Sequence, residues 1–152
     1  ILKHSNKFKI DINNAKILDF YSGVGSFGLE CLSRGAKKVI FVERDKRALQ
    51  ILKKNVTNLL ISKNSVTLVN AIQNALDRNK KEKIDIFFFD PPFLDKNFLE
   101  NLKIITNMQI FENNHIVIIH REKNSNDNFE NILNVLFSKN YGRSKIIFGR
   151  LI

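Results

Sequence analysis

The 152-residue sequence has one cysteine, Cys31, only two prolines, and no apolar run long enough to cross a membrane. A single cysteine excludes an internal disulfide and a zinc site built from cysteines. A membrane span needs roughly 20 apolar residues, and nothing at the start of the chain has the pattern of a signal peptide. We therefore expect a soluble, cytoplasmic protein in a reducing compartment.

Acidic residues are scarce relative to basic ones: 15 Asp and Glu stand against 25 Lys and Arg, for a formal net charge of +10. A positive field of this size suits a polyanion such as nucleic acid. The alternative explanation is a compositional bias toward Asn, Ile and Lys. The chain starts without Met and stops inside an apolar run at Ile152, so we expect a fragment trimmed at both ends.

Apolar segments alternate with amphipathic ones, which predicts a doubly wound α/β sheet with right-handed crossovers. Polar, charged connectors are expected at 79–83 and 121–127. Nearly continuous apolar runs predict strands at 15–20, 37–43, 65–69, 84–89, 115–120 and 144–150, with 150–152 opening a further strand. Helical spacing predicts helices at 26–34, 45–60, 71–78, 96–107 and 128–138.

A glycine-rich stretch follows the first predicted strand. Gly23, Gly25 and Gly28 have the spacing GxGxxG, which allows a tight turn and the close approach of a ligand to the backbone. Dinucleotide-binding proteins and methyltransferases share this spacing, and a purely structural turn is a third explanation. Asp19 favours S-adenosylmethionine, because an acid before the loop suits a cationic amino-acid moiety and would repel a pyrophosphate. The pattern Asp19-x-Tyr21-x-Gly-x-Gly is the spacing used by class I methyltransferases.

Two polar residues follow the next two predicted strands. Glu43 ends the second strand, where a carboxylate can accept both hydroxyls of a ribose. A surface ion pair with Arg44 or Lys46 is the alternative. Asn70 ends the third strand, where its amide can bind an adenine edge or equally well cap the next helix.

The two prolines stand together in "FFFDPPF", residues 87–93, at the end of the fourth predicted strand. Ligands of open α/β sheets bind outside the carboxyl ends of the strands, so Asp90 should face the glycine-rich loop. The Asp90 carboxylate and the Pro91 carbonyl could accept both hydrogens of an exocyclic amine, because the Pro-Pro backbone is held extended. Phe93 could stack on a flat base. A strand-ending turn with a core phenylalanine is the alternative.

The stretches "LDFYSGVGSFGLECLSRGA", "VIFVERD", "VNA" and "FFFDPPF" resemble, in this order and spacing, the RsmD-type bacterial rRNA methyltransferases. The resemblance implies a doubly wound, Rossmann-like class I methyltransferase fold, with a mostly parallel sheet and an antiparallel last strand. It also implies methyl transfer from S-adenosylmethionine to N2 of a guanine in 16S rRNA or the small ribosomal subunit. We expect one catalytic domain over residues 1–152, a monomer, and no metal.

The resemblance also assigns roles to single positions. His120 stands where the family pattern has Glu, Tyr21 stands where Phe is common, and a basic segment expected before Ile1 is absent. The catalytic tetrad falls on Asp90, Pro91, Pro92 and Phe93. Cofactor-binding positions fall on Asp19, Tyr21, Gly23, Gly25, Glu43, Arg44, Asn70, Ala71 and Asp90.

Other functions share parts of this pattern. A DNA adenine or cytosine amino-methyltransferase has the same tetrad but usually needs an inserted recognition region, and a protein glutamine methyltransferase more often has Asn at position 90. A non-catalytic RNA module that binds the cofactor has no need for the Asp90 carboxylate, and Asp19 disfavours a dehydrogenase. His4, His115 and His120 are scattered, which predicts edge or surface histidines and no metal site.

Overall fold

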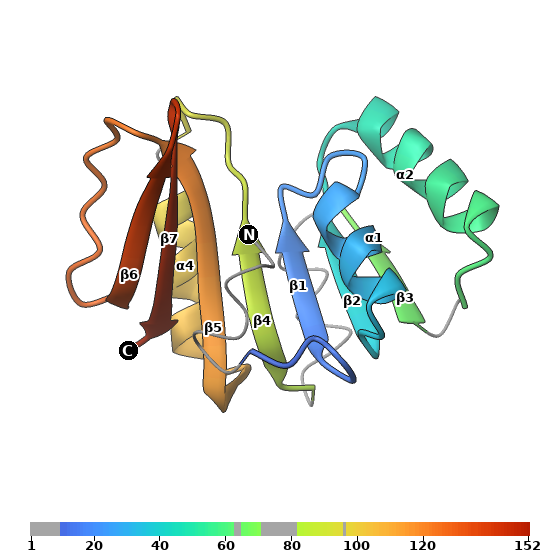
Figure 1. Ribbon diagram of the computed structural model, residues 1–152, viewed down its shortest axis with the longest axis horizontal. Helices are drawn as coiled ribbons and strands as arrows, with labels where there is room; N and C mark the ends of the chain where they lie inside the picture. The colour runs from blue at the N-terminus through green and yellow to red at the C-terminus, as the bar shows by residue number, and fades with distance from the viewer. Residues whose placement is uncertain (1–9, 63–64, 71–81, 96) are drawn as a thin grey trace.

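The computed structural model of the protein describes residues 10–62, 65–70, 82–95 and 97–152. Within them, seven strands form one sheet in the order β3-β2-β1-β4-β5-β7-β6 (Figure 1). The strands are β1 (Lys16–Phe20), β2 (Lys38–Val42), β3 (Val66–Val69), β4 (Ile84–Phe89), β5 (Phe111–Glu122), β6 (Leu133–Tyr141) and β7 (Ser144–Leu151). The helices are α1 (Ser26–Ser33), α2 (Lys46–Asn58) and α4 (Phe98–Met108).

The first five strands are parallel, and β7 is antiparallel to both of its neighbours. This arrangement confirms the predicted doubly wound sheet with an antiparallel last strand. The strand order reverses between β1 and β4, so the carboxyl ends of these two adjacent strands form the topological switch point, where open α/β sheets bind ligands.

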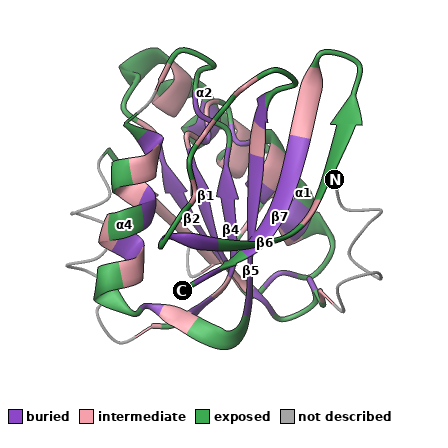
Figure 2. Ribbon diagram, turned by 90° about the vertical axis from the view of Figure 1, so that its left-hand side faces the viewer, coloured by how far each residue is buried: buried purple, intermediate pink, exposed green. Residues whose placement is uncertain are grey.

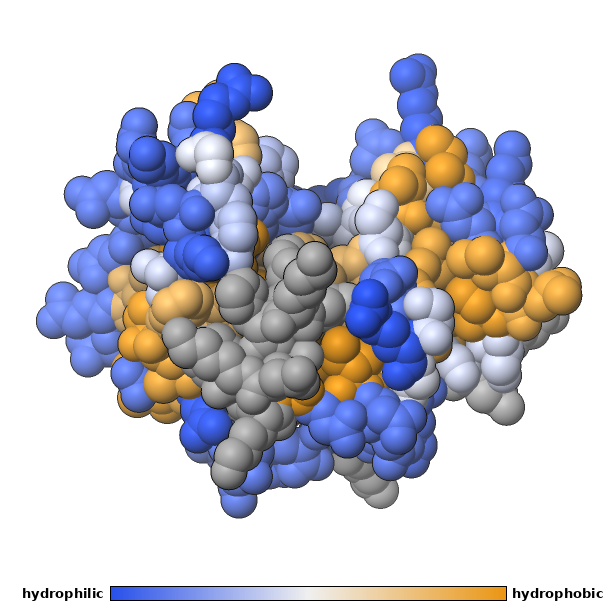
Figure 3. Space-filling model, in the orientation of Figure 1, coloured by the Kyte–Doolittle hydropathy of each residue, from blue (hydrophilic) through white to orange (hydrophobic). Residues whose placement is uncertain are grey.

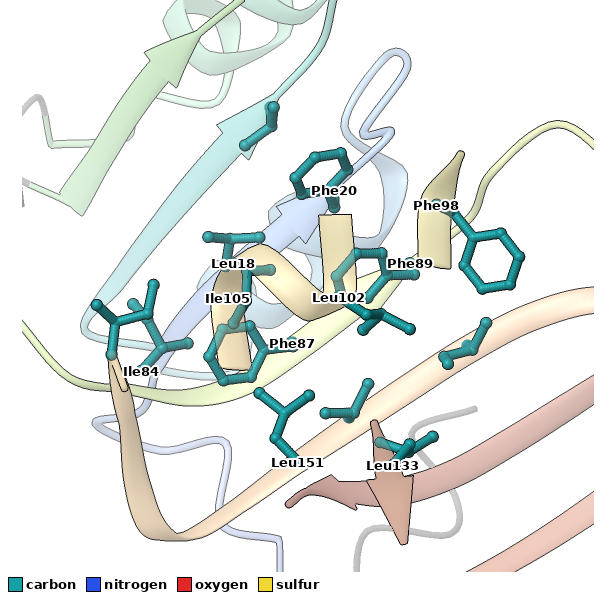
Figure 4. Packing of buried hydrophobic residues seen from close by; sticks show 14 of the residues in the cluster. Leu18, Phe20, Ile84, Phe87, Phe89, Phe98, Leu102, Ile105, Leu133 and Leu151 are labelled. Atoms are coloured by element: carbon teal, nitrogen blue, oxygen red, sulfur yellow. The ribbon is translucent and has the colours of Figure 1, made fainter. Parts of the chain in front are cut away.

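Helices cover both faces of the sheet, which explains why the strands are almost continuously apolar. Leu102 of α4 packs with Phe87 and Phe89 on one face (Figure 4). Leu52 of α2 and Phe88 of β4 belong to the cluster on the other face. Figure 2 shows the central strands buried between α4 and α1. Each fully buried Phe or Leu contributes about 1.5–3 kcal/mol, so this double covering fixes the strand positions.

Three of the predicted helices are present close to their predicted bounds, and two of them have an end that the sequence explains. The Asp45 side chain accepts from the Ala48 N–H at 2.8 Å and so caps α2, as expected. Gly35 follows α1 with φ of 91°, a conformation that glycine adopts without strain. The predicted helix at 71–78 lies outside the described residues.

The predicted helix at 128–138 is wrong, because these residues form a turn followed by β6. Asn131 has φ of 57°, which stops a helix after one turn. Ile132 and Leu133 are buried in the core beside α4. The predicted strand at 144–150 and the further strand at 150–152 are one strand, β7.

One prediction of exposure holds only in part, and another is wrong. The stretch 121–127 is not simply a solvated connector, because Arg121 belongs to β5 and is 2% exposed. His115 is buried, not at an edge or surface: its Nδ1 lies 2.6 Å from the Glu112 carbonyl, and its Nε2 accepts from the Leu151 N–H at 2.8 Å. Burial lowers the pKa of His115. None of the described helices is long and apolar enough to span a membrane.

Candidate active site

The glycine-rich loop turns sharply between β1 and α1. Tyr21, Gly23 and Gly25 have φ values of 63°, 55° and 90°, so three of five consecutive residues are in conformations that L-residues rarely adopt. The Gly25 N–H donates to the Ser22 carbonyl at 2.8 Å, which closes the turn. A Cβ at Gly25 would collide with the Leu52 side chain. The loop backbone is therefore held tightly and exposed toward the carboxyl edge of the sheet.

A cleft of about 470 Å³ lies at this edge. Asp19 and Asp90 both line it, because β1 and β4 are neighbouring strands with Phe20 opposite Phe89. Tyr21 and Gly23 of the glycine-rich loop line it too. The sequence did not single out the other residues that line the cleft, which are Ser22, Val24, Ser26, Phe27, Glu30 and Phe88. The rings of Phe27 and Phe88 are stacked, with their centroids 3.9 Å apart.

Asp19 places a buried carboxyl group at this cleft. The residue is 1% exposed, and its Oδ2 accepts from the Gly28 N–H at 3.0 Å. Its Oδ1 is buried and has no hydrogen-bond partner among the described residues. Burial raises the pKa of Asp19 from 3.8 to about 8; the bond from Gly28 opposes this shift, and the nearby Asp90 and Glu43 carboxylates add to it. An uncompensated acceptor of this kind is suited to a cationic ligand.

Glu43 ties the glycine-rich loop to the start of α2. Its Oε2 accepts from the Gly23 N–H and its Oε1 from the Asp45 N–H, both at 2.7 Å. Among the described residues, Glu43 therefore pairs with these two backbone N–H groups and not, as the alternative required, with the side chain of Arg44 or Lys46. Arg44 is exposed. Because each carboxylate oxygen can accept a further hydrogen bond, Glu43 can still bind a ligand hydroxyl.

Two further predicted cofactor-binding residues follow the third strand, and one of them, Asn70, is predicted to bind the adenine. Asn70 is exposed directly after β3 and is not among the residues that line the cleft. Ala71 lies outside the described residues. Glu43 is nevertheless adjacent to this strand end, since its N–H donates to the Val69 carbonyl at 3.0 Å.

Asp90 stands at the start of the segment that follows β4. Its N–H donates to the Phe20 carbonyl at 3.3 Å, which continues the pairing of β4 with β1. Its side chain is 46% exposed, and its Oδ1 lies 2.7 Å from Nδ1 of His120. His120 is therefore a direct neighbour of the candidate catalytic carboxylate, not merely an edge histidine.

The segment Pro91 to Phe93 leaves an aromatic ring exposed. Phe93 is 46% exposed, and its ring makes a T-shaped contact with the His120 ring, with the centroids 5.9 Å apart. Pro91 is buried, whereas Pro92 is exposed. The Pro92 and Phe93 carbonyls accept from the Arg121 guanidinium, a contact that the sequence did not indicate.

Tyr21 links the loop to α4. The Asn101 side-chain amide donates to the Tyr21 hydroxyl oxygen at 3.0 Å. Burial raises the pKa of this hydroxyl, and a hydrogen bond with Asp95 raises it further. Within the described ranges, no group of three His, Cys, Asp or Glu side chains could hold a metal ion.

The strand order of the sheet, with a buried acid near the end of β1, a glycine-rich turn after β1, and Asp-Pro-Pro-Phe after β4, is that of the class I methyltransferase fold. Residues 3–150 match the family described as Conserved hypothetical protein 95. The chain belongs to this family, which contains the RsmD-type methyltransferases.

Individual relatives support the same family. The chain is 34% identical over 116 residues to Ribosomal RNA small subunit methyltransferase D of Haemophilus influenzae, a match that covers 74% of this chain and 59% of the relative. The chain thus spans less than two thirds of this curated relative. The crystal structure of the "putative methylase HI0767" from the same species superposes with a TM-score of 0.80 and 28% identity, covering 99% of this chain and 97% of that one.

A shorter match leads to a different kind of methyltransferase. Release factor glutamine methyltransferase of Borreliella burgdorferi is 39% identical over 85 residues, which covers 56% of this chain and 28% of that relative.

Proposed function

We propose that residues 1–152 are the catalytic domain of a methyltransferase that transfers a methyl group from S-adenosylmethionine to N2 of a guanine in 16S rRNA. One observation carries this proposal: a single cleft is lined both by Asp19, whose buried Oδ1 has no partner among the described residues, and by Asp90, whose carboxylate is exposed. The first suits the ammonium group of the methyl donor, and the second suits the amine that accepts the methyl group.

The residues around the glycine-rich loop fit the cofactor. Asp19 would accept from the ammonium, Glu43 would accept from the ribose hydroxyls, and the turn at Gly23 and Gly25 leaves backbone open to the methionine part. Tyr21 would complete this side of the cleft, Asn70 would lie toward the adenine, and Arg44 and Ala71 would be further cofactor-binding positions. When bound, S-adenosylmethionine supplies an electrophilic methyl group on a sulfonium.

Asp90 would act on the acceptor amine. The lone pair of guanine N2 is delocalised into the ring, so the amine is a poor nucleophile until its hydrogens are held. The Asp90 carboxylate and the Pro91 carbonyl would accept these two hydrogens, since no described hydrogen bond uses the Pro91 carbonyl. The new N–C bond forms as the S–C bond breaks, and the proton that the amine then releases can pass to Asp90. Holding both partners in line supplies much of the rate.

Phe93 would hold the base itself. The ring is exposed next to Asp90, and base–aromatic stacking contributes about 1–3 kcal/mol per base. In a duplex the neighbouring bases occupy both faces of the guanine, so the target guanine must be unstacked before Phe93 can stack on it.

The β6–β7 hairpin provides a basic surface beside this site. Glu122 pairs with Ser144, so the hairpin tip lies next to the end of β5, near the loop that follows β4 (Figure 1). Hydrophilic residues gather over this part of the molecule (Figure 3). Lys123, Lys139 and Arg143 are exposed there, with Glu122 among them, and Lys139 lies 5.3 Å from the exposed Tyr141 ring. We propose that this hairpin tip binds the rRNA backbone.

Reversing two charges at the hairpin tip should weaken RNA binding. We expect Lys139→Glu/Arg143→Glu to lower the affinity for a 16S rRNA fragment about tenfold, and to reduce the slope of log K against log salt by about two. Fluorescence anisotropy over a salt series measures both. The control is Lys37→Glu/Arg150→Glu, which makes the same charge change at the opposite edge of the sheet. An equal loss in the control would mean that only the total charge matters.

Methyl transfer from tritiated S-adenosylmethionine tests the whole proposal. The substrates are 16S rRNA, small ribosomal subunits, DNA and a glutamine-containing release-factor peptide, followed by nucleoside and amino-acid analysis. We expect label in N2-methylguanosine from rRNA or the subunit. Label in glutamine would instead support a second candidate function, protein glutamine methylation. The match to the Borreliella burgdorferi enzyme is the observation that favours this candidate. Asp90 disfavours it, because those enzymes more often carry Asn there. An rRNA substrate would place the protein in the cytoplasm. We also propose that it acts as a monomer.

A further inference from the structure

Arg121 is a buried cation in β5, the strand next to β4, and it contacts the segment that follows Asp90. Its side chain is 3% exposed. Nε donates to Oδ2 of Asp127 at 3.0 Å, and Nη2 donates to Oδ1 at 3.2 Å. Nη1 donates to the Pro92 carbonyl at 3.2 Å, and Nη2 also donates to the Phe93 carbonyl at 3.1 Å. One side chain therefore joins β5 to two consecutive backbone carbonyls.

These contacts exceed what a buried ion pair requires. A guanidinium has five N–H groups in a rigid plane, and the four hydrogen bonds described above divide evenly between a carboxylate and a backbone. The Phe98 ring, with its centroid 4.5 Å from the guanidinium carbon, covers one face of the cation. Asp127 neutralises the charge, so the two bonds to Pro92 and Phe93 serve the position of that segment.

Beyond the buried Pro91, the segment after Asp90 has few other means of being held. Phe93 is 46% exposed and Leu94 is 95% exposed, so burial does not fix either side chain. Pro91 and Pro92 have no N–H to donate to a neighbouring strand. The Asp95 N–H donates to the Pro92 carbonyl at 2.8 Å, which closes a local turn without attaching it to the sheet. The bonds from Arg121 attach the backbone of this segment to β5, whereas His120 of β5 contacts only side chains, the Asp90 carboxylate and the Phe93 ring.

We propose that Arg121 is a positioning residue for methyl transfer: it fixes the backbone of Pro92 and Phe93, and thereby the stacking ring and the Pro91 carbonyl. The inference rests on the proposed function for the identity of the base, whereas the attachment of the segment is independent of it. Arg121 does not touch the base. Loosening the segment lowers the fraction of complexes with the amine in line, so kcat falls. Cofactor binding uses other residues and is unaffected.

The test compares Arg121→Lys with wild type. Lysine keeps a charge for Asp127 but lacks the planar fork that reaches two carbonyls at once. We expect amide hydrogen exchange at Phe93 to Asp95 to accelerate about tenfold, and kcat for rRNA to fall about tenfold. Calorimetry should show an unchanged affinity for S-adenosylmethionine. The matched control is Arg150→Lys, an exposed arginine at the opposite edge of the sheet, which should behave as wild type.

Several results would overturn the proposal. An Arg121→Lys variant with the melting temperature of wild type and an unchanged exchange rate at Phe93 to Asp95 would show that Arg121 does not hold the segment. Faster exchange with unchanged kcat would show that holding it does not matter for catalysis. If this variant does not fold, Asp127→Asn can replace it, because it weakens the hydrogen bonds that orient Arg121. It should give a smaller rise in the exchange rate and a smaller fall in kcat. If wild type transfers no methyl group to RNA, the proposed function fails, and the exchange rates still decide the attachment.

Discussion

Replacing Asp90 with asparagine is expected to lower kcat for methyl transfer to 16S rRNA by roughly 10²–10³-fold, the usual effect of removing one preorganised polar group at the reacting atoms. The amide is nearly the same size as the carboxylate, and its oxygen can still accept from His120, 2.7 Å away in the wild-type protein. The variant loses a charged acceptor for the amine hydrogens and a destination for the proton. Single-turnover assays with tritiated cofactor measure the effect.

The affinity for S-adenosylmethionine, unlike kcat, should not fall in Asp90→Asn. The Asp90 charge is one of the causes that raise the pKa of Asp19, so its removal makes the Asp19 carboxylate easier to ionise. Calorimetry should therefore show that Asp90→Asn binds S-adenosylmethionine at least as tightly as wild type. The control is Asp85→Asn on the same strand, where the carboxylate accepts from the Lys16 N–H at the opposite edge of the sheet. An Asp90→Asn variant with a rate within threefold of wild type would refute the acceptor role.

The sequence predicted the part of the site that depends on strand ends. Asp19 lies near the end of one apolar strand and Asp90 directly follows another, and the carboxyl ends of adjacent parallel strands must meet at one edge of the sheet. The structure places both side chains at one cleft with Tyr21 and Gly23, as this reasoning requires. Their chemical roles stay predictions, because the same positions could serve ligands of more than one kind.

The failure at 128–138 has a specific cause. Phe129, Ile132, Leu133 and Leu136 have helical spacing, and three of them do pack together, around a single turn that ends at Asn131. The strand that follows is irregular, because the register shifts between Val135 and Phe137. That irregularity removes the two-residue alternation that would have indicated a strand. Val135 and Leu136 are both about half exposed, so burial gave no alternation either.

The contacts of Arg121 and His120 could not be predicted from the sequence, for a different reason. Their environment depends on β5 continuing past its apolar centre to Glu122, and on the segment after β4 folding over toward it. In sequence, Arg121 begins a polar stretch, and such stretches are usually solvated. Its burial depends on Asp127, Phe98 and two backbone carbonyls, which come together only in three dimensions.

A second large effect is expected for Asp19→Asn, in which cofactor binding and stability should change in opposite directions. We expect the affinity for S-adenosylmethionine to fall by at least about 100-fold, because a buried cation is left without its carboxylate. Asparagine can still accept from the Gly28 N–H through its side-chain oxygen, so the turn is kept. Calorimetric titration measures the loss, and Asp85→Asn again provides the matched control.

Stability should change with pH in a defined sense. The pKa of Asp19 is raised from 3.8 to about 8 on folding, so between these values the folded state binds one more proton than the unfolded state. The free energy of unfolding of wild type therefore falls as pH rises through this window, by up to about 1.4 kcal/mol per unit. Asp19→Asn lacks this dependence. Urea unfolding from pH 4 to 8 should show a variant that becomes progressively more stable than wild type.

The same proton links pH to binding. At pH 7 the Asp19 carboxyl of the free protein is largely protonated, whereas an ammonium partner requires the carboxylate. Binding should then release close to one proton from wild type, which titrations in two buffers of different ionisation enthalpy would detect. An Asp19→Asn variant that is less stable than wild type at pH 8 and still binds the cofactor would mean that the carboxylate serves the glycine-rich turn. The opposite pair of results means that the fold keeps an unfavourable carboxyl group because the ligand needs it.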